Sequence, residues 1–115
     1  MPTPAAFLPL TPVVFEILVS LASEDRHGYS MLGDIRTRTG EHVRAGSLYR
    51  ALNRLLDDGL IQELDERPDL KLDDERRRYY RLTALGRKVA EAEAARLQAQ
   101  VRAARSARLL PRRRG

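Results

Sequence analysis

The chain has 115 residues, of which 43% are hydrophobic, 5% aromatic and 32% charged. This length allows one small domain with a single core, and the absence of cysteine excludes disulfides and thiolate metal sites. The 21 Lys and Arg outnumber the 16 Asp and Glu, which favours a polyanionic partner such as nucleic acid or an anionic membrane surface. The longest apolar run, residues 13–22, is too short to span a bilayer. We therefore expect a soluble, cytoplasmic protein.

The N-terminal third of the chain begins with a proline-containing segment, residues 1–10, which is predicted to form a flexible arm. Thr11 offers an N-cap oxygen and Pro12 has the φ of a first helical position, so the first helix is predicted to run over residues 12–22. Residues 23–27 are predicted to be a polar connection to the next helix.

A second helix is predicted over residues 28–39, and Gly40 is its expected end. Tyr29, Leu32 and Ile35 recur on one apolar stripe, which predicts that Tyr29 packs in the core. The short turn that follows the helix could also hold a minimal strand over residues 42–45.

The third predicted helix, which begins near Gly46 and ends before Gly59, has one apolar and one basic face. The apolar residues at helical spacing are Leu48, Ala51, Leu52, Leu55 and Leu56, and the other faces carry Ser47, Tyr49, Arg50, Asn53 and Arg54. Two helices joined by a short glycine-bounded turn indicate a helix-turn-helix, in which the second helix reads DNA. We call this third helix the reader.

A hairpin, which we call the wing, follows the reader. Residues 60–64 and 76–82 are predicted to form two antiparallel strands, and the acid-rich residues 65–75, which include Pro68, form the tip between them. Three helices followed by a hairpin indicate a mainly α fold with a small β-hairpin, the winged helix-turn-helix, over residues 11–83. Leu82 and one tyrosine of the second strand are expected to join the core, but alternation leaves open which strand face meets DNA.

The last predicted helix covers residues 84–107 and is capped by Thr83. It is too long for the compact domain, so we expect it to pair with the same helix of a second copy. The residues predicted to make this homodimer contact are Leu85, Val89, Ala90, Ala94, Leu97, Val101 and Ala104. Residues 108–115 are predicted to be a basic, disordered tail.

The candidate DNA-binding residues lie on the reader and on the second strand of the hairpin. Arg50 and Arg54, one helical turn apart, could form forked bonds to guanine or hold phosphate, and the alternative is that they are simply solvated. The other candidates are Ser47, Tyr49, Asn53 and the hairpin arginines Arg77 and Arg78. Three of them have an alternative role: Ser47 could instead cap the helix, Tyr49 could pack under the wing, and Asn53 could simply be solvated.

No catalytic, metal-binding or cofactor-binding residues are predicted. His27 and His42 lack partners at metal-ligand spacing, which favours a structural role. The acidic residues 73–75 are expected to form a solvated turn. The sequence has no phosphate loop, nucleophile elbow or His paired with an obvious acid, which argues against an enzyme. Among the rivals to DNA binding, a winged helix used only for protein contacts is stronger than an enzyme. No membrane partner is expected, because the apolar face of the arginine-rich last helix is mostly alanine.

Five short motifs occur in order between residues 10 and 105. They are Thr11-Pro12 before an apolar helix, His27-Gly28-Tyr29, Gly46-Ser47-Leu48-Tyr49, Asp58-Gly59-Leu60-Ile61, and Arg78-Tyr79-Tyr80-Arg81-Leu82-Thr83 before Gly86. Their order and spacing resemble the PadR family of bacterial transcriptional regulators, in its short form with one helix after the wing. The resemblance implies a winged helix-turn-helix, a homodimer held partly by the C-terminal helix, and repression at palindromic double-stranded operator DNA. An aromatic effector pocket is not carried over, because the last helix has no aromatic residue; any effector, the operator sequence and the regulated genes stay unknown.

Overall fold

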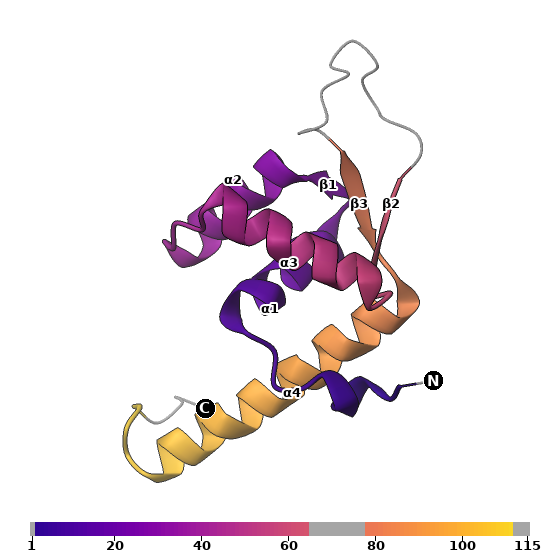
Figure 1. Ribbon diagram of the computed structural model, residues 1–115. Helices are drawn as coiled ribbons and strands as arrows, with labels where there is room; N and C mark the ends of the chain where they lie inside the picture. The colour runs from indigo at the N-terminus through magenta and orange to yellow at the C-terminus, as the bar shows by residue number, and fades with distance from the viewer. Residues whose placement is uncertain (1, 65–77, 112–115) are drawn as a thin grey trace.

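The computed structural model describes residues 2–64 and 78–111. In chain order its elements are the 3-10 turn η1 (Pro4–Phe7), α1 (Pro12–Ser23), β1 (Arg26–His27), α2 (Gly28–Thr39), α3 (Ala45–Asp57), β2 (Ile61–Glu63), β3 (Tyr79–Leu82) and α4 (Ala84–Ser106). Helices α1 to α3 form a cluster with the strands at one side, and α4 runs along another side (Figure 1). The predicted fold, mainly helical with a small antiparallel sheet, is therefore confirmed.

Side-chain caps fix where three of the helices begin. Thr11 and Thr83 use their hydroxyl oxygens, and His27 uses Nδ1, to accept the N–H of the residue three positions further on, at 3.0–3.3 Å. Each bond satisfies one amide that lacks a helical carbonyl partner. The starts of α1, α2 and α4 consequently agree with the sequence prediction.

Glycines in the left-handed region mark the ends of α2 and α3. Gly40 and Gly59 both have a φ of 75°. After α3, Leu60 N donates to Leu55 O at 3.0 Å and Gly59 N donates to Leu56 O at 3.1 Å, which is the pair of bonds that defines a Schellman motif. The reader therefore ends where the sequence predicts.

The sheet has three strands rather than the predicted two. In the strand order β1-β3-β2, Arg26 pairs with Tyr80 and His27 with Tyr79. The prediction that residues 23–27 form only a connection was wrong, because a two-residue strand is too short to show a period of two. The minimal strand considered possible over residues 42–45 does not form: none of these residues is in a strand, and α3 already begins at Ala45.

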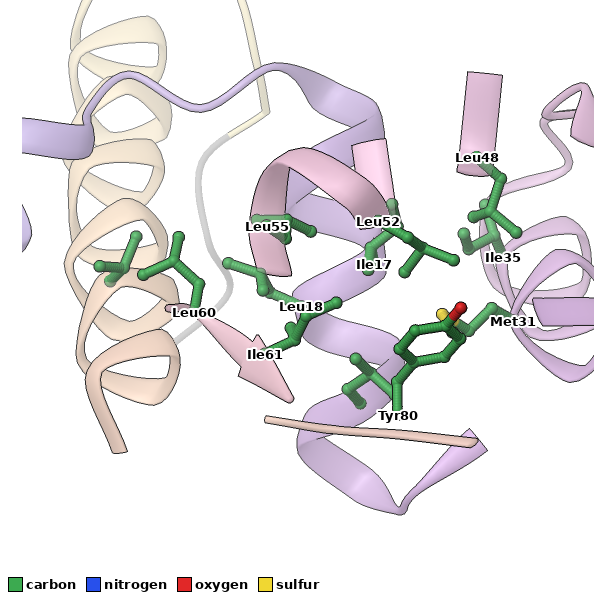
Figure 2. Close-up of a cluster of buried hydrophobic side chains, with 12 residues drawn as sticks. Ile17, Leu18, Met31, Ile35, Leu48, Leu52, Leu55, Leu60, Ile61 and Tyr80 are labelled. Carbon is green, nitrogen blue, oxygen red and sulfur yellow. The ribbon is translucent and has the colours of Figure 1, made fainter. Parts of the chain in front are cut away.

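The core lies between the three-helix cluster, β2, β3 and the first half of α4. Its buried side chains are Ile17, Leu18, Leu21, Met31, Ile35, Leu48, Leu52, Leu55, Leu60, Ile61, Tyr80 and Val89. In Figure 2, Leu52 and Leu55 of the reader face Ile17 and Leu18 of α1, Leu48 lies beside Ile35 of α2, and Leu60 lies beside α4. The reader is thus anchored on its aliphatic face, as predicted.

Tyr29 does not pack in the core, contrary to the prediction. Its side chain is 46% exposed, whereas Met31 and Ile35 are fully buried. The buried stripe of α2 is rotated toward Met31, and this places Tyr29 at the edge of the stripe, on the solvent side. The helical period correctly predicted that α2 has an apolar stripe, but it did not predict which residues form the centre of that stripe.

Residues 4–10 are packed against the domain, which differs from the predicted flexible arm. Phe7, Leu8 and Leu10 are half-buried against the core, and Leu10 N donates to Glu93 Oε2 of α4 at 3.3 Å. The prolines led to the prediction of a flexible segment. The apolar side chains between them favour packing, because packing removes their surface from water.

Glu93 is the only carboxylate of the described residues that is buried, with 1% of its surface exposed. Arg96 donates to it twice, from Nε at 2.6 Å and from Nη2 at 2.9 Å. These hydrogen bonds from Arg96, the charge of its guanidinium and the bond from Leu10 N hold the pKa of Glu93 below its ordinary value, although burial opposes them. The buried charge is therefore paired rather than orphaned.

The end of α4 is a turn at residues 107–110. Arg108 has a φ of 63°, and Leu109 N donates to Ala104 O at 2.8 Å. The part of the predicted disordered tail before residue 112 therefore forms a defined turn, and residues 112–115 lie outside the described chain. None of the helices described is long and apolar enough to cross a bilayer.

Candidate nucleic-acid interface

The reader α3 presents a polar face opposite its buried leucines. Arg50, Asn53 and Arg54 are exposed, whereas Leu48, Leu52 and Leu55 on the other face are buried. Within the parts of the chain that the structure describes, Arg50 and Arg54 form no ion pair. An anionic partner can therefore bind these guanidinium groups without breaking an ion pair to any described residue.

Arg50 lies back along the helix toward its N-terminus. Its Nη2 donates to Ser47 Oγ at 3.3 Å, and its Nη1 lies 3.5 Å from where a Cβ on Gly46 would be. A Cβ at position 46 would therefore make only an ordinary van der Waals contact with the guanidinium, which lies beside the first turn. Arg50 and the first turn of the reader thus form one continuous surface.

Ser47 is not the N-cap of the reader, so that alternative is removed. The N-cap is Arg44, which makes no side-chain capping bond, and Ser47 is the third helical residue. The first helical bond runs from Leu48 N to Arg44 O at 3.0 Å, so the amides of residues 45–47 have no carbonyl acceptor within the helix. Such amides and the helix dipole favour an anion at this end.

Arg44 is a candidate that the sequence analysis missed. It is exposed and immediately precedes the reader, and it makes no ion pair with any described residue. A signal was present in the sequence, because Arg44, Ser47 and Arg50 are spaced by three and so lie along one side of the first turns. Arg44 adds positive charge where the free amides already favour an anion.

Tyr49 packs inward rather than on the exposed face. It is half-buried against the core, and a Cβ on Gly28 would lie 2.5 Å from its hydroxyl oxygen. The absence of a side chain at Gly28, the first residue of α2, is what makes room for the ring. The ring of Tyr49 therefore packs against α2, and its contact with DNA stays a prediction.

In β3 the tyrosine that joins the core is Tyr80. It is 5% exposed, and burial, reinforced by the charge of Glu63, raises its pKa. Leu82 on the same side is half-buried against the core, as predicted. His27 and Tyr79 meet edge to face at 5.3 Å between ring centroids, so His27 has the structural role that the sequence favoured.

The arginines of β3 differ from those of the reader because acids hold them. Arg81 Nη2 lies 2.8 Å from Asp25 Oδ2, and Arg78 Nε lies 3.4 Å from Glu63 Oε1. Arg77 falls outside the described residues, so its placement stays a prediction. Contact between Arg78 or Arg81 and phosphate would have to compete with these ion pairs.

An ion-pair network joins α1 to α2. Arg38 donates to Glu16 Oε1 at 2.6 Å and to Asp34 Oδ2 at 2.8 Å, and Arg26 lies 3.6 Å from Asp34. Burial alone would raise the pKa of Asp34, but the hydrogen bond from Arg38 and the charges of Arg38 and Arg26 hold it below its ordinary value. The network holds the first helix of the helix-turn-helix in place.

The predicted dimer residues of α4 divide into two groups. Val89 is fully buried in the core of its own domain, and Leu85 and Ala90 pack against that core, so their first role is within the protomer. Val101 is 38% exposed and Ala94 is also exposed, whereas Leu97 and Ala104 are half-buried. The second group leaves an apolar surface on α4 in the single chain.

A shallow groove of about 190 Å³ adjoins this surface of α4. It is lined mainly by apolar side chains of α1 and α4, and also by Arg87 and Glu91. The apolar lining residues are Phe15, Val19, Ala22, Leu82, Ala90 and Ala94. Two of the predicted dimer residues therefore lie in this groove.

Comparison with known proteins identifies relatives for this arrangement. Residues 17–92 match the model of the transcriptional regulator PadR-like family. A transcriptional regulator from Clostridium thermocellum has 27% sequence identity and a TM-score of 0.67, covering 82% of this chain and 87% of its own. A PadR family transcription regulator from Clostridium difficile has 22% identity and a TM-score of 0.71, covering 84% of this chain and 97% of its own.

Another similar structure is that of Bacillus subtilis PadR in complex with operator DNA. It has 22% identity and a TM-score of 0.62, covering 73% of this chain and 47% of its own. At this identity the likeness shows that the fold is shared. No curated protein sequence matches the chain significantly.

Proposed function

Because the chain belongs to the PadR-like family of transcriptional regulators, we propose that it is a sequence-specific DNA-binding repressor that acts in the cytoplasm as a homodimer on a palindromic operator. The observation that carries this proposal is the exposed face of α3, where Arg50 and Arg54 project without acidic partners among the described residues. The complex of the Bacillus subtilis neighbour with operator DNA supports it.

The reader supplies both kinds of DNA contact. Arg50 forms a forked pair with a guanine in the major groove, Arg54, one helical turn further along α3, contacts the same stretch of that groove, and Asn53 contacts a base edge between them. Arg44 and Ser47 hold a backbone phosphate at the free amides of the first turn. Phosphate contacts fix the position of the helix and base contacts supply the sequence preference.

The wing adds contacts to the DNA backbone through Arg77 and Arg78. Both residues precede β3 in the sequence, and we propose that they reach the phosphates that flank the major groove or the adjacent minor groove. Since Arg78 is paired with Glu63 at 3.4 Å, its contact is weaker than that of an unpaired arginine. The wing therefore contributes affinity more than sequence preference.

The dimer forms through α4. Ala94, Leu97, Val101 and Ala104 meet the partner, and the groove between α1 and α4 receives part of the partner's helix, since both surfaces are apolar and open in the single chain. A two-fold dimer places the two readers in successive major grooves about 34 Å apart.

DNA capture tests the function directly. The purified protein would be incubated with fragments of its source genome at low salt, and the retained fragments would be sequenced and used in gel shifts at two salt concentrations. Enrichment of a shared palindrome and weaker retardation at higher salt support the proposal. The alternative, a winged helix that contacts only proteins, predicts no retardation even at low salt.

The dimer contact is tested in the full chain by Val101→Glu. A charge in the apolar seam should convert the dimer to a monomer in sedimentation velocity, because the carboxylate would be desolvated in the interface. Ala99→Glu is the matched control, since residue 99 is exposed on the opposite side of the same helix. A dimer that tolerates Val101→Glu as well as Ala99→Glu would remove α4 from the interface.

A further inference from the structure

The end of the reader and the beginning of α4 share one hydrogen-bonded joint. Thr83 Oγ1 donates to Gly59 O at 2.7 Å, and Thr83 N donates to Leu60 O at 3.1 Å. The same hydroxyl oxygen accepts from Gly86 N at 3.0 Å. One side chain thus caps α4 and at the same time holds the turn that ends α3.

Gly86 brings the two elements closer than any other residue would allow. A Cβ at this position would overlap the carbonyl oxygen of Leu60 and lie 2.8 Å from Leu82 Cδ1. The carbonyl cannot easily move away, because it is part of the peptide backbone and accepts from Thr83 N. The first turn of α4 therefore packs directly against the turn that follows the reader.

This joint is placed where a small rotation has a large effect. Helix α4 has 23 residues and is therefore about 34 Å long, and it runs from the joint past the rest of the domain (Figure 1). A rotation of about 10° at its start would move its far end by about 6 Å, which exceeds the rise of roughly 3.4 Å for one base pair. A change of about 10° in the angle between α3 and α4 would therefore displace the far end of α4 by more than one base-pair step.

We infer that Thr83 and Gly86 are specificity-determining residues for half-site spacing: together with the packing of Leu85 and Val89 on the core, they fix the angle between α3 and α4 and so set the distance between the two readers. The inference rests on the proposed DNA-binding dimer. It assigns sequence preference within each half-site to α3, and preference for the length of the spacer between half-sites to the joint.

The test measures the binding of operators whose half-sites are separated by different spacers. The palindrome recovered with the wild-type protein would be lengthened or shortened by one and two base pairs, and a single half-site would be used in parallel. For the wild type we expect at least a tenfold loss of affinity when the spacer changes. For Thr83→Val we expect this loss to shrink to threefold or less, with unchanged affinity for the single half-site.

Three controls separate the joint from a general loss of stability. Thr83→Ser keeps the hydroxyl and should restore the wild-type spacing preference. Thr11→Val removes the corresponding cap of α1, where Thr11 Oγ1 accepts from Val14 N at 3.3 Å, and should leave the preference unchanged. Gly33→Ala should also leave it unchanged, since a Cβ at Gly33 meets nothing within 4 Å; Gly86→Ala should behave as Thr83→Val, provided that it folds.

The outcomes are distinct. Thr83→Val with the same spacing penalty as the wild type would overturn the inference, and so would a wild type that binds the palindrome regardless of spacer length. If the wild type retards no DNA at low salt, the proposed function itself fails, and the inference fails with it.

Discussion

The arginines of α3 and those of β3 carry the same charge in different surroundings. Arg50 and Arg54 are exposed and have no acidic partner among the described residues, whereas Arg81 is held by Asp25 at 2.8 Å and Arg78 lies 3.4 Å from Glu63. An arginine without a partner can bind an anion directly, but a paired one must first exchange its carboxylate. A basic run in a sequence therefore indicates a DNA contact only where the fold leaves the charges unpaired.

The largest effect is expected for Arg50→Ala. Loss of a forked contact to guanine should weaken operator binding by about 1–3 kcal/mol, or roughly 5- to 150-fold, and should relax the preference at one base pair of each half-site. Competition binding with operators substituted at each position measures both effects. Unchanged affinity together with an unchanged preference would place Arg50 outside the interface.

A smaller and uniform effect is expected when Arg77 and Arg78 are both replaced by alanine. The double variant should bind specific and unrelated DNA more weakly by the same factor, and the slope of log affinity against log salt should shrink by about 0.9 for each lost phosphate contact. Binding isotherms at several salt concentrations measure the slope. If the loss were confined to the operator, the wing would be reading sequence, contrary to this account.

Arg81→Ala should change DNA affinity by less than about twofold, since exposed charges already engaged in ion pairs contribute little. Asp25→Asn sharpens the comparison, because it removes the partner while keeping the shape of the side chain. It should increase the salt slope if Arg81 can reach phosphate once released. An effect of Arg81→Ala as large as that of Arg50→Ala would show that pairing does not distinguish the two regions.

The pair of Arg96 with Glu93 extends the comparison to an arginine that is not expected to take part in DNA binding. The pKa of Glu93 is lowered by the hydrogen bonds from Arg96, so the native state binds fewer protons than the unfolded state. The resulting stabilisation is complete above the ordinary glutamate pKa of about 4.3 and is lost as the pH falls from there through the lowered value.

Glu93→Gln should therefore weaken the dependence of Tm on pH below about pH 5, with DNA affinity at neutral pH unchanged. Thermal unfolding between pH 3 and 7 measures this, with Glu91→Gln as the exposed control on the same helix. Parallel Tm curves for the wild type and Glu93→Gln would contradict the assigned pairing.

Local signals in the sequence were sufficient for most of the fold. The caps at Thr11 and Thr83 and the left-handed glycines Gly40 and Gly59 act through bonds to residues within a few positions, so the ends of the helices could be predicted closely. The packing of residues 4–10 could not, because Leu10 meets Glu93 across 83 positions of sequence.

The candidate site was predictable in part for the same reason. Helical spacing placed Arg50 and Arg54 opposite the leucines, and this depends only on the period of a helix. Whether a basic or aromatic residue is available depends on distant partners: Arg81 meets Asp25 56 positions away, and Tyr49 packs on Gly28 in another helix. Those contacts follow from the tertiary fold and leave no local pattern.

The central claim is that the exposed cationic face of α3 binds duplex DNA. The most direct measurement is fluorescence anisotropy of the captured operator with the wild type and with a variant that carries both Arg50→Glu and Arg54→Glu, at low and moderate salt. We predict tight, salt-sensitive binding by the wild type and no detectable binding by a folded variant. Equal binding by the two proteins would contradict the claim.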